Sequence, residues 1–362
     1  MTKVSSCRAL GAADVASAAQ LACLLEASAP KPGNVSPGRH FADSRYEDFL
    51  ASAVAIGEPL AGAGMRSVGA TVRLAVEATA RWTRSNTNLG IVLLLTPIAR
   101  AAALEKGDGS HFPAPKVVEK GDGSILPAQN EGQGTSHGYL VPRSKMTPVP
   151  FSRTLRSAVR EVLESTTVED ARDVYAAIRR AAPGGLGLVE AQDVANEPTI
   201  TLLDAMRLAA DRDVVAREYA TAFEITFGTG APALDRARGA GLSWDEAIVE
   251  TFLTLLADNP DTHVARRGGA ELAADVSKQA RGALASGGVR SASGRRAIDD
   301  MDRRMRDSRN TANPGSTADL TAAAIFVVLL GGGWPGRPGH NEAFGPVTGV
   351  SNAGVGGPDA AR

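Results

Sequence analysis

A chain of 362 residues, 43% of them hydrophobic, is long enough to bury a large core in one domain or two. Aromatic residues make up only 4% while alanine and leucine abound, which favours helices over a β-sandwich or a β-barrel. The net charge is −1 and charges of both signs are mixed along the chain, so no broad basic face for nucleic acid is expected.

Helical periodicity recurs along the chain, and no convincing alternating strand interrupts it. The first helix, for example, places Val15, Ala22 and Leu25 on one face. The predicted fold is all-α, a single bundle-like domain of about a dozen helices. The helices are expected at 12–28, 46–62, 67–82, 88–104, 153–164, 168–181, 199–210, 213–227, 244–258, 269–285, 293–308 and 317–331.

Three of these helices begin with a hydroxyl residue three positions ahead of an acid, which is the pattern of a capping box. The hydroxyl oxygen is expected to accept a hydrogen bond from an otherwise unpaired amide of the first turn. The pairs are Thr167 with Asp170, Ser243 with Glu246, and Ser316 with Asp319.

One stretch, 105–150, departs from the helical pattern. It is dense in proline and glycine, and the hexapeptide Glu-Lys-Gly-Asp-Gly-Ser occurs in it twice. Such a composition buries too little apolar surface to offset the entropy of ordering. We therefore predict a flexible insertion, a tolerated loop rather than a functional lid, in one helical catalytic domain made of 1–104 and 151–331. The segment 332–362 is predicted to be a flexible tail.

The apolar segments and the cysteines favour a cytoplasmic protein that does not enter a membrane. No basic stretch followed by an apolar core opens the chain, so no signal peptide is expected. The most apolar run, 320–330, is shorter than the ~20 residues that span a bilayer. Cys7 and Cys23 lack the spacing of metal ligands and are expected to be packing residues in a reducing compartment.

The first polar loop between helices, residues 29–35, is a candidate binding segment, since binding residues concentrate on loops. Two prolines stiffen it, and Gly33 permits a close approach of the backbone to a ligand. Lys31 could offer a point charge to a phosphate, with Asn34 beside it. The alternative is an ordinary helix-terminating turn with a solvated lysine, which the local sequence alone favours.

A second candidate is the run Asn86-Thr87-Asn88, directly before the apolar segment 91–95. Small polar side chains can cap a helix, and the amides of a helix start can hold an anion. Capping alone explains one asparagine but not three consecutive hydrogen-bonding side chains. Structural and functional interpretations are therefore equally supported here.

The third candidate is segment 261–269, in which an acid, a histidine, two arginines and two glycines fall within nine residues. Arg266 and Arg267 can pair with phosphate oxygens, while Asp261 could hold a magnesium ion or accept a proton. A lone histidine such as His263 is more often structural. The cluster as a whole favours function.

Two further groups are weaker. The turn 313–319 delivers a helix N-terminus that suits a phosphate, although the simpler role of Asp319 is to complete a capping box. Asp211 and Asp213 could coordinate a magnesium–triphosphate, although a solvated helix end is the simpler interpretation. No segment matches a Walker loop, a dinucleotide fingerprint or a serine-hydrolase elbow.

Taken in order, several of these segments resemble the triphosphoribosyl-dephospho-coenzyme A synthase family. The resemblance runs from about residue 14 to 331 and leaves out the insertion. It implies an all-α fold and a reaction in which the 2′-hydroxyl of 3′-dephospho-coenzyme A displaces adenine from ATP. The matching segments are 30–33, 49–53, 86–88, 261–263, 267–269 and 313–320.

The resemblance also implies roles for the candidate residues, with Mg²⁺ accompanying ATP. Phosphates need a cationic clamp, the attacking hydroxyl needs a base, and the departing adenine needs stabilisation. The candidate catalytic residues are Asp261, Asp319 and His263. The candidate phosphate- and nucleotide-binding residues are Lys31, Asn34, Asn86, Thr87, Asn88, Arg266, Arg267, Gly268, Gly269, Asn313 and Thr317. The candidate metal ligands are Asp261, Asp211 and Asp213.

One departure from the family bears on the acceptor. Members that serve carrier-protein lyases continue with a His-Lys pair where this chain has Asn88-Leu89. That form resembles a branch of methanogens and C1-oxidising bacteria, associated with tetrahydromethanopterin or methanofuran. The alternatives are therefore an enzyme of C1-cofactor synthesis with another acceptor, or a non-catalytic nucleotide-binding assembly protein. The partners expected are small molecules, and a homodimer is one assembly that the sequence allows.

Overall fold

The structure is a computed structural model that describes residues 10–104, 151–184, 187 and 189–334. The predicted all-α class is confirmed: apart from one isolated bridge between Ser36 and Arg39, these residues contain no β-structure. The α-helices are α1 (Ala12–Ser28), α2 (Tyr46–Ala55), α3 (Gly57–Ala61), α4 (Val68–Thr79), α5 (Leu89–Leu104), α6 (Phe151–Glu164), α7 (Val168–Ala181), α8 (Leu202–Ala209), α9 (Val214–Ala220), α10 (Ala231–Gly239), α11 (Trp244–Asp258), α12 (Thr262–Gly268), α13 (Ala270–Ala285), α14 (Ala292–Met305) and α15 (Gly315–Leu330).

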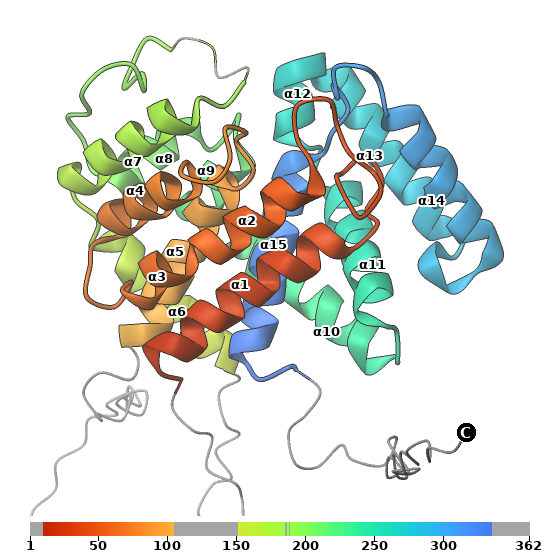
Figure 1. Cartoon of the computed structure of the whole chain (residues 1–362), viewed down its shortest axis with the longest axis horizontal. Helices are drawn as coiled ribbons and strands as arrows, with labels where there is room; N and C mark the ends of the chain where they lie inside the picture. The colour runs from red at the N-terminus through yellow and green to blue at the C-terminus, as the bar shows by residue number, and fades with distance from the viewer. Residues whose placement is uncertain (1–9, 105–150, 185–186, 188, 335–362) are drawn as a thin grey trace, which may run out of the picture.

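Two helices, α5 and α15, form the centre of the molecule. Twelve of the sixteen residues of each are buried, as expected of helices that are apolar on all sides. They pack against each other, α1 packs across both, and α11 packs on α15. Figure 1 shows α4, α7, α8 and α9 on one side of this centre and α10 to α14 on the other. None of the described helices combines the length and apolarity that a membrane span requires.

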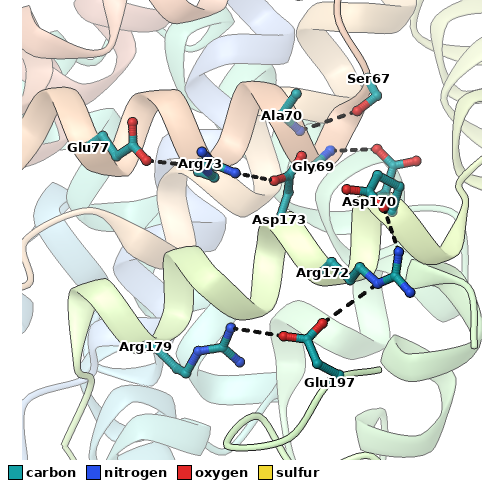
Figure 2. Close-up of polar contacts among 11 residues, drawn as sticks. Ser67, Gly69, Ala70, Arg73, Glu77, Asp170, Arg172, Asp173, Arg179 and Glu197 are labelled. Carbon is teal, nitrogen blue, oxygen red and sulfur yellow. Dashed lines mark hydrogen bonds and ion pairs between the residues drawn. The ribbon is translucent and has the colours of Figure 1, made fainter. Parts of the chain in front are cut away.

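The contact between α4 and α7 is close because Gly69 has no side chain. The backbone amide of Gly69 donates a hydrogen bond of 2.7 Å to the Asp170 carboxylate (Figure 2). The same carboxylate accepts a bond of 2.9 Å from the amide of Thr167, which confirms the predicted capping box. Beside it, Arg73 bridges Glu77 and Asp173 on the surface (Figure 2).

Gly69→Ala is expected to destabilise the protein by about 1–3 kcal/mol, the usual effect of overpacking. A Cβ at Gly69 would lie 2.5 Å from the Cα and the carbonyl oxygen of Asp170, so backbone must move. Urea unfolding measures the change. The control is Gly282→Ala in α13, where a Cβ meets nothing within 4 Å and a gain of about 0.5–1 kcal/mol is expected. An unchanged Gly69→Ala protein would contradict this account of the interface.

The other two capping predictions had different outcomes. Ser243 caps α11 and Glu246 completes the box, as predicted. The pair of Ser316 with Asp319 was wrong, because α15 begins at Gly315 and Pro314 is its N-cap. Ser316 therefore lies inside the helix, where its hydroxyl interacts with Thr262 of α12 at 3.0 Å. Asp319 is left free for another role.

The predicted helix 213–227 is interrupted after α9. The backbone becomes left-handed at Ala222 and Phe223, with φ of 49° and 58°. The buried carboxylate of Glu218 accepts a hydrogen bond of 2.8 Å from the amide of Thr226, which stabilises the turn that follows. A π-helical turn then leads into α10. Apolar periodicity continues through this turn, so the sequence alone does not reveal it.

Three smaller differences separate the predicted helices from the observed ones. The predicted helix 46–62 is divided at Ile56 into α2 and α3. Both α10 and α12 were missed, and each is too short for several turns of periodicity.

Buried apolar residues from α1 through α15 form a continuous core, so the segments before and after the insertion pack together. The insertion 105–150 and most of the tail 332–362 lie outside the described residues, and the domain division stays a prediction.

Candidate active site

A cavity of about 760 Å³ lies where α7, α8 and α9 approach α12 and the start of α15. The loops before α2 and α5 complete its wall. Its volume is in the range of sites that bind small molecules and cofactors. Most of the candidate residues line it, and their arrangement determines what chemistry it can support.

Asp261 holds two helix starts together beside the cavity. One carboxylate oxygen accepts hydrogen bonds from the amides of His263 and Val264, at 2.8 and 3.0 Å. The other accepts bonds of 2.7 Å from both the amide and the hydroxyl of Thr317 in α15. Asp261 is buried and does not line the cavity, and nor does Thr317. The geometry thus gives this pair a positioning role, since both carboxylate oxygens are already engaged.

His263 lines the cavity, and the contact of its Nδ1 favours one tautomer of the imidazole. Its Nδ1 lies 3.0 Å from the carbonyl oxygen of Asn313, which can only accept, so Nδ1 carries the proton. Nε2 then presents a lone pair, and no group among the described residues hydrogen-bonds it. Burial lowers the pKa of His263, with Arg266 and Arg267 adding to the effect against the opposing charge of Asp261. The imidazole is therefore a neutral base.

Asp319 lines the same cavity and is the second group suited to proton transfer. Burial raises the pKa of Asp319 well above its ordinary value, and the charges of Glu26, Asp261 and Asp213 raise it further. Arg266 opposes the shift without cancelling it. Within the described part of the chain, no group hydrogen-bonds this carboxyl. A carboxyl with a raised pKa can hold a proton and donate it.

Glu26 was missed by the sequence interpretation, and it lies in the cavity wall. Lys31 forms a buried ion pair with it, Nζ to Oε1 at 3.0 Å, and also donates to the carbonyl oxygen of Ala29 at 3.3 Å. Lys31 itself is fully buried and does not line the cavity, so the structure does not bring it to a phosphate. A single carboxylate on the buried face of an apolar helix was the signal that could have identified Glu26.

Four arginines line the cavity. Arg266 is paired with Asp213, which also caps α9, and Arg267 donates to the carbonyl oxygen of Arg309. The other two are Arg84 and Arg212, which the sequence did not single out as site residues. Arg84 has no partner among the described residues. Guanidinium groups from separate segments that face one cavity can hold the oxygens of a polyphosphate.

Hydrogen-bonding side chains from the predicted loops also reach the cavity. The Nδ2 group of Asn34 donates to Oδ1 of Asn313 at 2.7 Å, which joins the first loop to the last. Asn88 donates to the hydroxyl of Thr79 at 3.0 Å, and Asn86 accepts from the amide of Leu89 at 3.2 Å. The predicted residues that line the cavity are Asn34, Asn86, Thr87, Asn88, Asp213, His263, Arg266, Arg267, Asn313 and Asp319.

The remaining predicted residues are not brought into the cavity. Gly268 and Gly269 are exposed and form the end of α12, where Gly269 has φ of 90°. Asp211 is exposed and outside the lining, whereas Asp213 lines the cavity but is already engaged by Arg266 and by the amides of α9. The described residues contain no group of three or more metal-ligating side chains. Asp261, Asp211 and Asp213 therefore do not fit as ligands of one metal ion.

A carboxyl with a raised pKa and an imidazole with a lowered pKa thus share an arginine-lined cavity in a chain whose described residues fold into helices, an arrangement suited to an all-α enzyme. Residues 12–338 match the family model described as ATP:dephospho-CoA triphosphoribosyl transferase. The chain belongs to this family, as the resemblance predicted.

Individual relatives share shorter stretches. Two proteins named "Probable 2-(5''-triphosphoribosyl)-3'-dephosphocoenzyme-A synthase" are 37% identical to this chain. The match in Pseudomonas putida spans 117 residues, 32% of this chain and 41% of the relative. That in Pseudomonas paraeruginosa spans 110 residues, 30% of this chain and 37% of the relative. The chain thus spans about two fifths of the length of the curated relatives it matches.

A solved structure resembles the fold over a longer range. It comes from Archaeoglobus fulgidus and is provisionally named triphosphoribosyl-dephospho-CoA synthase. The match has a TM-score of 0.52 at 24% identity and covers 78% of this chain and 99% of the other. At this identity the likeness is one of fold.

Proposed function

We propose that this protein transfers the triphosphoribosyl group of ATP to the 2′-hydroxyl of 3′-dephospho-coenzyme A and releases adenine. The product is 2′-(5″-triphosphoribosyl)-3′-dephospho-coenzyme A. The observation that carries the proposal is that His263 and Asp319, with opposite pKa shifts, line one arginine-rich cavity in a member of this family. The names of the curated relatives favour this acceptor over a C1-cofactor precursor.

The attacking side of the reaction needs a base. Nε2 of His263 accepts the proton of the 2′-hydroxyl as its oxygen forms a bond to the anomeric carbon of ATP's ribose. The Nδ1–H bond to Asn313 fixes the tautomer and orients the ring. Because the pKa of His263 is lowered, the imidazole is in its basic form at neutral pH.

The departing side needs an acid. The bond from the anomeric carbon to adenine breaks, and its electron pair leaves with the base. The protonated carboxyl of Asp319 gives its proton to a ring nitrogen of the adenine, which makes the adenine a better leaving group. An oxocarbenium-like centre develops between these events, and the nearby Glu26 carboxylate offers it negative charge.

The arginines hold the triphosphate in place. Arg84, Arg212, Arg266 and Arg267 come from three separate segments and can surround the phosphate chain, and Asn34 and Asn313 are placed to bind ribose hydroxyls. Mg²⁺ with ATP remains part of the proposal as a counter-ion of the phosphates, with no protein ligand assigned. The cytoplasmic location and the homodimer stay predictions.

Purified protein incubated with Mg–ATP and dephospho-coenzyme A is expected to release free adenine in a 1:1 ratio to acceptor consumed, as followed by chromatography and mass spectrometry. Omission of the acceptor is the control and should give no adenine. If adenine is released only with a pterin or furan precursor, that precursor takes the place of dephospho-coenzyme A as the acceptor. Binding of ATP without any release would point to the assembly protein instead.

A further inference from the structure

One wall of the cavity is built from α7 and α8 and carries no charge. Val174, Tyr175 and Ile178 come from α7, and Leu202 and Met206 from α8. The hydroxyl of Tyr175 already donates to the carbonyl oxygen of Gln192 at 2.7 Å, so its ring is the part left to face a ligand. The ionised residues of these two helices do not line the cavity; Asp193 and Arg212, which do, belong to the segments that follow α7 and α8.

This uncharged wall runs from the interior to the surface. Val174 and Leu202 are fully buried, whereas Leu208 at the end of α8 also lines the cavity and is 54% exposed. Covering an exposed leucine with an apolar group is favourable, because apolar surface is removed from water. A ligand group that starts inside and extends outward over Leu208 would gain this contact. A compact group held at the reacting centre would not.

We propose that the α7–α8 wall binds the pantetheine arm of the acceptor, an inference that rests on the proposed function. The arm is uncharged and flexible, and it is joined to the diphosphate at the end remote from the reacting ribose. It must therefore lead away from His263 and Asp319. The adenine of ATP is a poorer occupant, because it is bonded to the anomeric carbon that reacts and is therefore held at the reacting centre.

Leu208→Glu tests the assignment without disturbing the core. The substitution is expected to raise KM for dephospho-coenzyme A by about tenfold or more, since an apolar contact is lost and a carboxylate is placed beside the arm. The value of kcat is expected to stay the same. KM for ATP should change less than KM for dephospho-coenzyme A, and any change in it comes from Arg212, which donates to the carbonyl oxygen of Leu208 and can pair with the new carboxylate. The matched control is Leu104→Glu, also at the last turn of a helix and 48% exposed but outside the cavity. It should leave both KM values unchanged.

A binding measurement separates this inference from the proposed function. Calorimetric titration of dephospho-coenzyme A needs no turnover, and its Kd should rise in Leu208→Glu by the same factor as KM. 4′-Phosphopantetheine should compete with dephospho-coenzyme A but not with ATP. A raised KM for ATP alone would assign the wall to adenine, and equal Kd values in both proteins would overturn the inference. Absence of adenine release by the unmodified protein would overturn the proposed function, while the titration would still decide what the wall binds.

Discussion

Asp319→Asn is expected to lower kcat by about 10²–10⁴-fold, the usual contribution of a general acid. Asparagine keeps the size of the side chain but has no acidic proton to give to the departing adenine. Adenine release from ATP in the presence of dephospho-coenzyme A measures the loss. The control is Asp299→Asn, at an exposed position of α14 outside the cavity, which should retain full activity.

The pH dependence distinguishes an acid from a structural residue. The pKa of Asp319 is raised in the folded protein, so the acid is available at low pH and is lost as the pH rises through that value. The unmodified protein should lose activity on this alkaline side, and Asp319→Asn should lack the limb. A carboxyl whose pKa is raised in the folded protein also lowers the free energy of unfolding at any pH above its pKa in the unfolded chain. Asp319→Asn removes this cost and should therefore be more stable at neutral pH. Normal activity, or an unfolded variant, would contradict the assignment.

His263→Gln is expected to reduce kcat/KM by about 10²–10⁴-fold through loss of the base. Glutamine can still donate a hydrogen bond toward Asn313, but it cannot accept a proton at neutral pH. Steady-state rates at saturating ATP give the effect. His40→Gln is the control, because His40 is exposed and does not line the cavity.

The pH effect expected for His263 has the opposite sign to the one expected for Asp319. The pKa of His263 is lowered, so the imidazole remains a base down to a pH below its ordinary titration range and is lost only in more acidic solution. The acidic limb of the rate profile should therefore lie below the ordinary imidazole pKa and should vanish in His263→Gln. A variant that keeps this limb would assign it to another group and refute the role of His263.

The fold was predictable where local signals are strong. The capping boxes at Thr167 and Ser243 and the all-round apolar pattern of α5 and α15 depend on neighbours along the chain, and the structure agrees with them. The turn after α9 was missed because it depends on Glu218, a carboxylate that binds amides several residues ahead. The box at Ser316 failed because the helix begins two residues earlier than predicted, at Gly315.

The site was predictable in composition more than in arrangement. The polar loops were identified because such residues rarely cluster without a reason, and most of them do line the cavity. Whether a charge faces the cavity or a partner depends on residues far away in sequence. Lys31 forms an ion pair with Glu26, and Asp261 accepts a hydrogen bond from Thr317. Arg84 faces the cavity without a partner among the described residues. No local pattern contains that information.

The bond between Asp261 and Thr317 has a consequence for biosynthesis. The cavity draws on residues from Glu26 in α1 to Asp319 in α15, and α15 is the last described helix. A nascent chain lacking α15 leaves the Asp261 carboxylate without two of its four donors and leaves the apolar faces of α1, α5 and α11 uncovered. Substrate binding and escape from proteolysis should thus appear together, once α15 has left the ribosome.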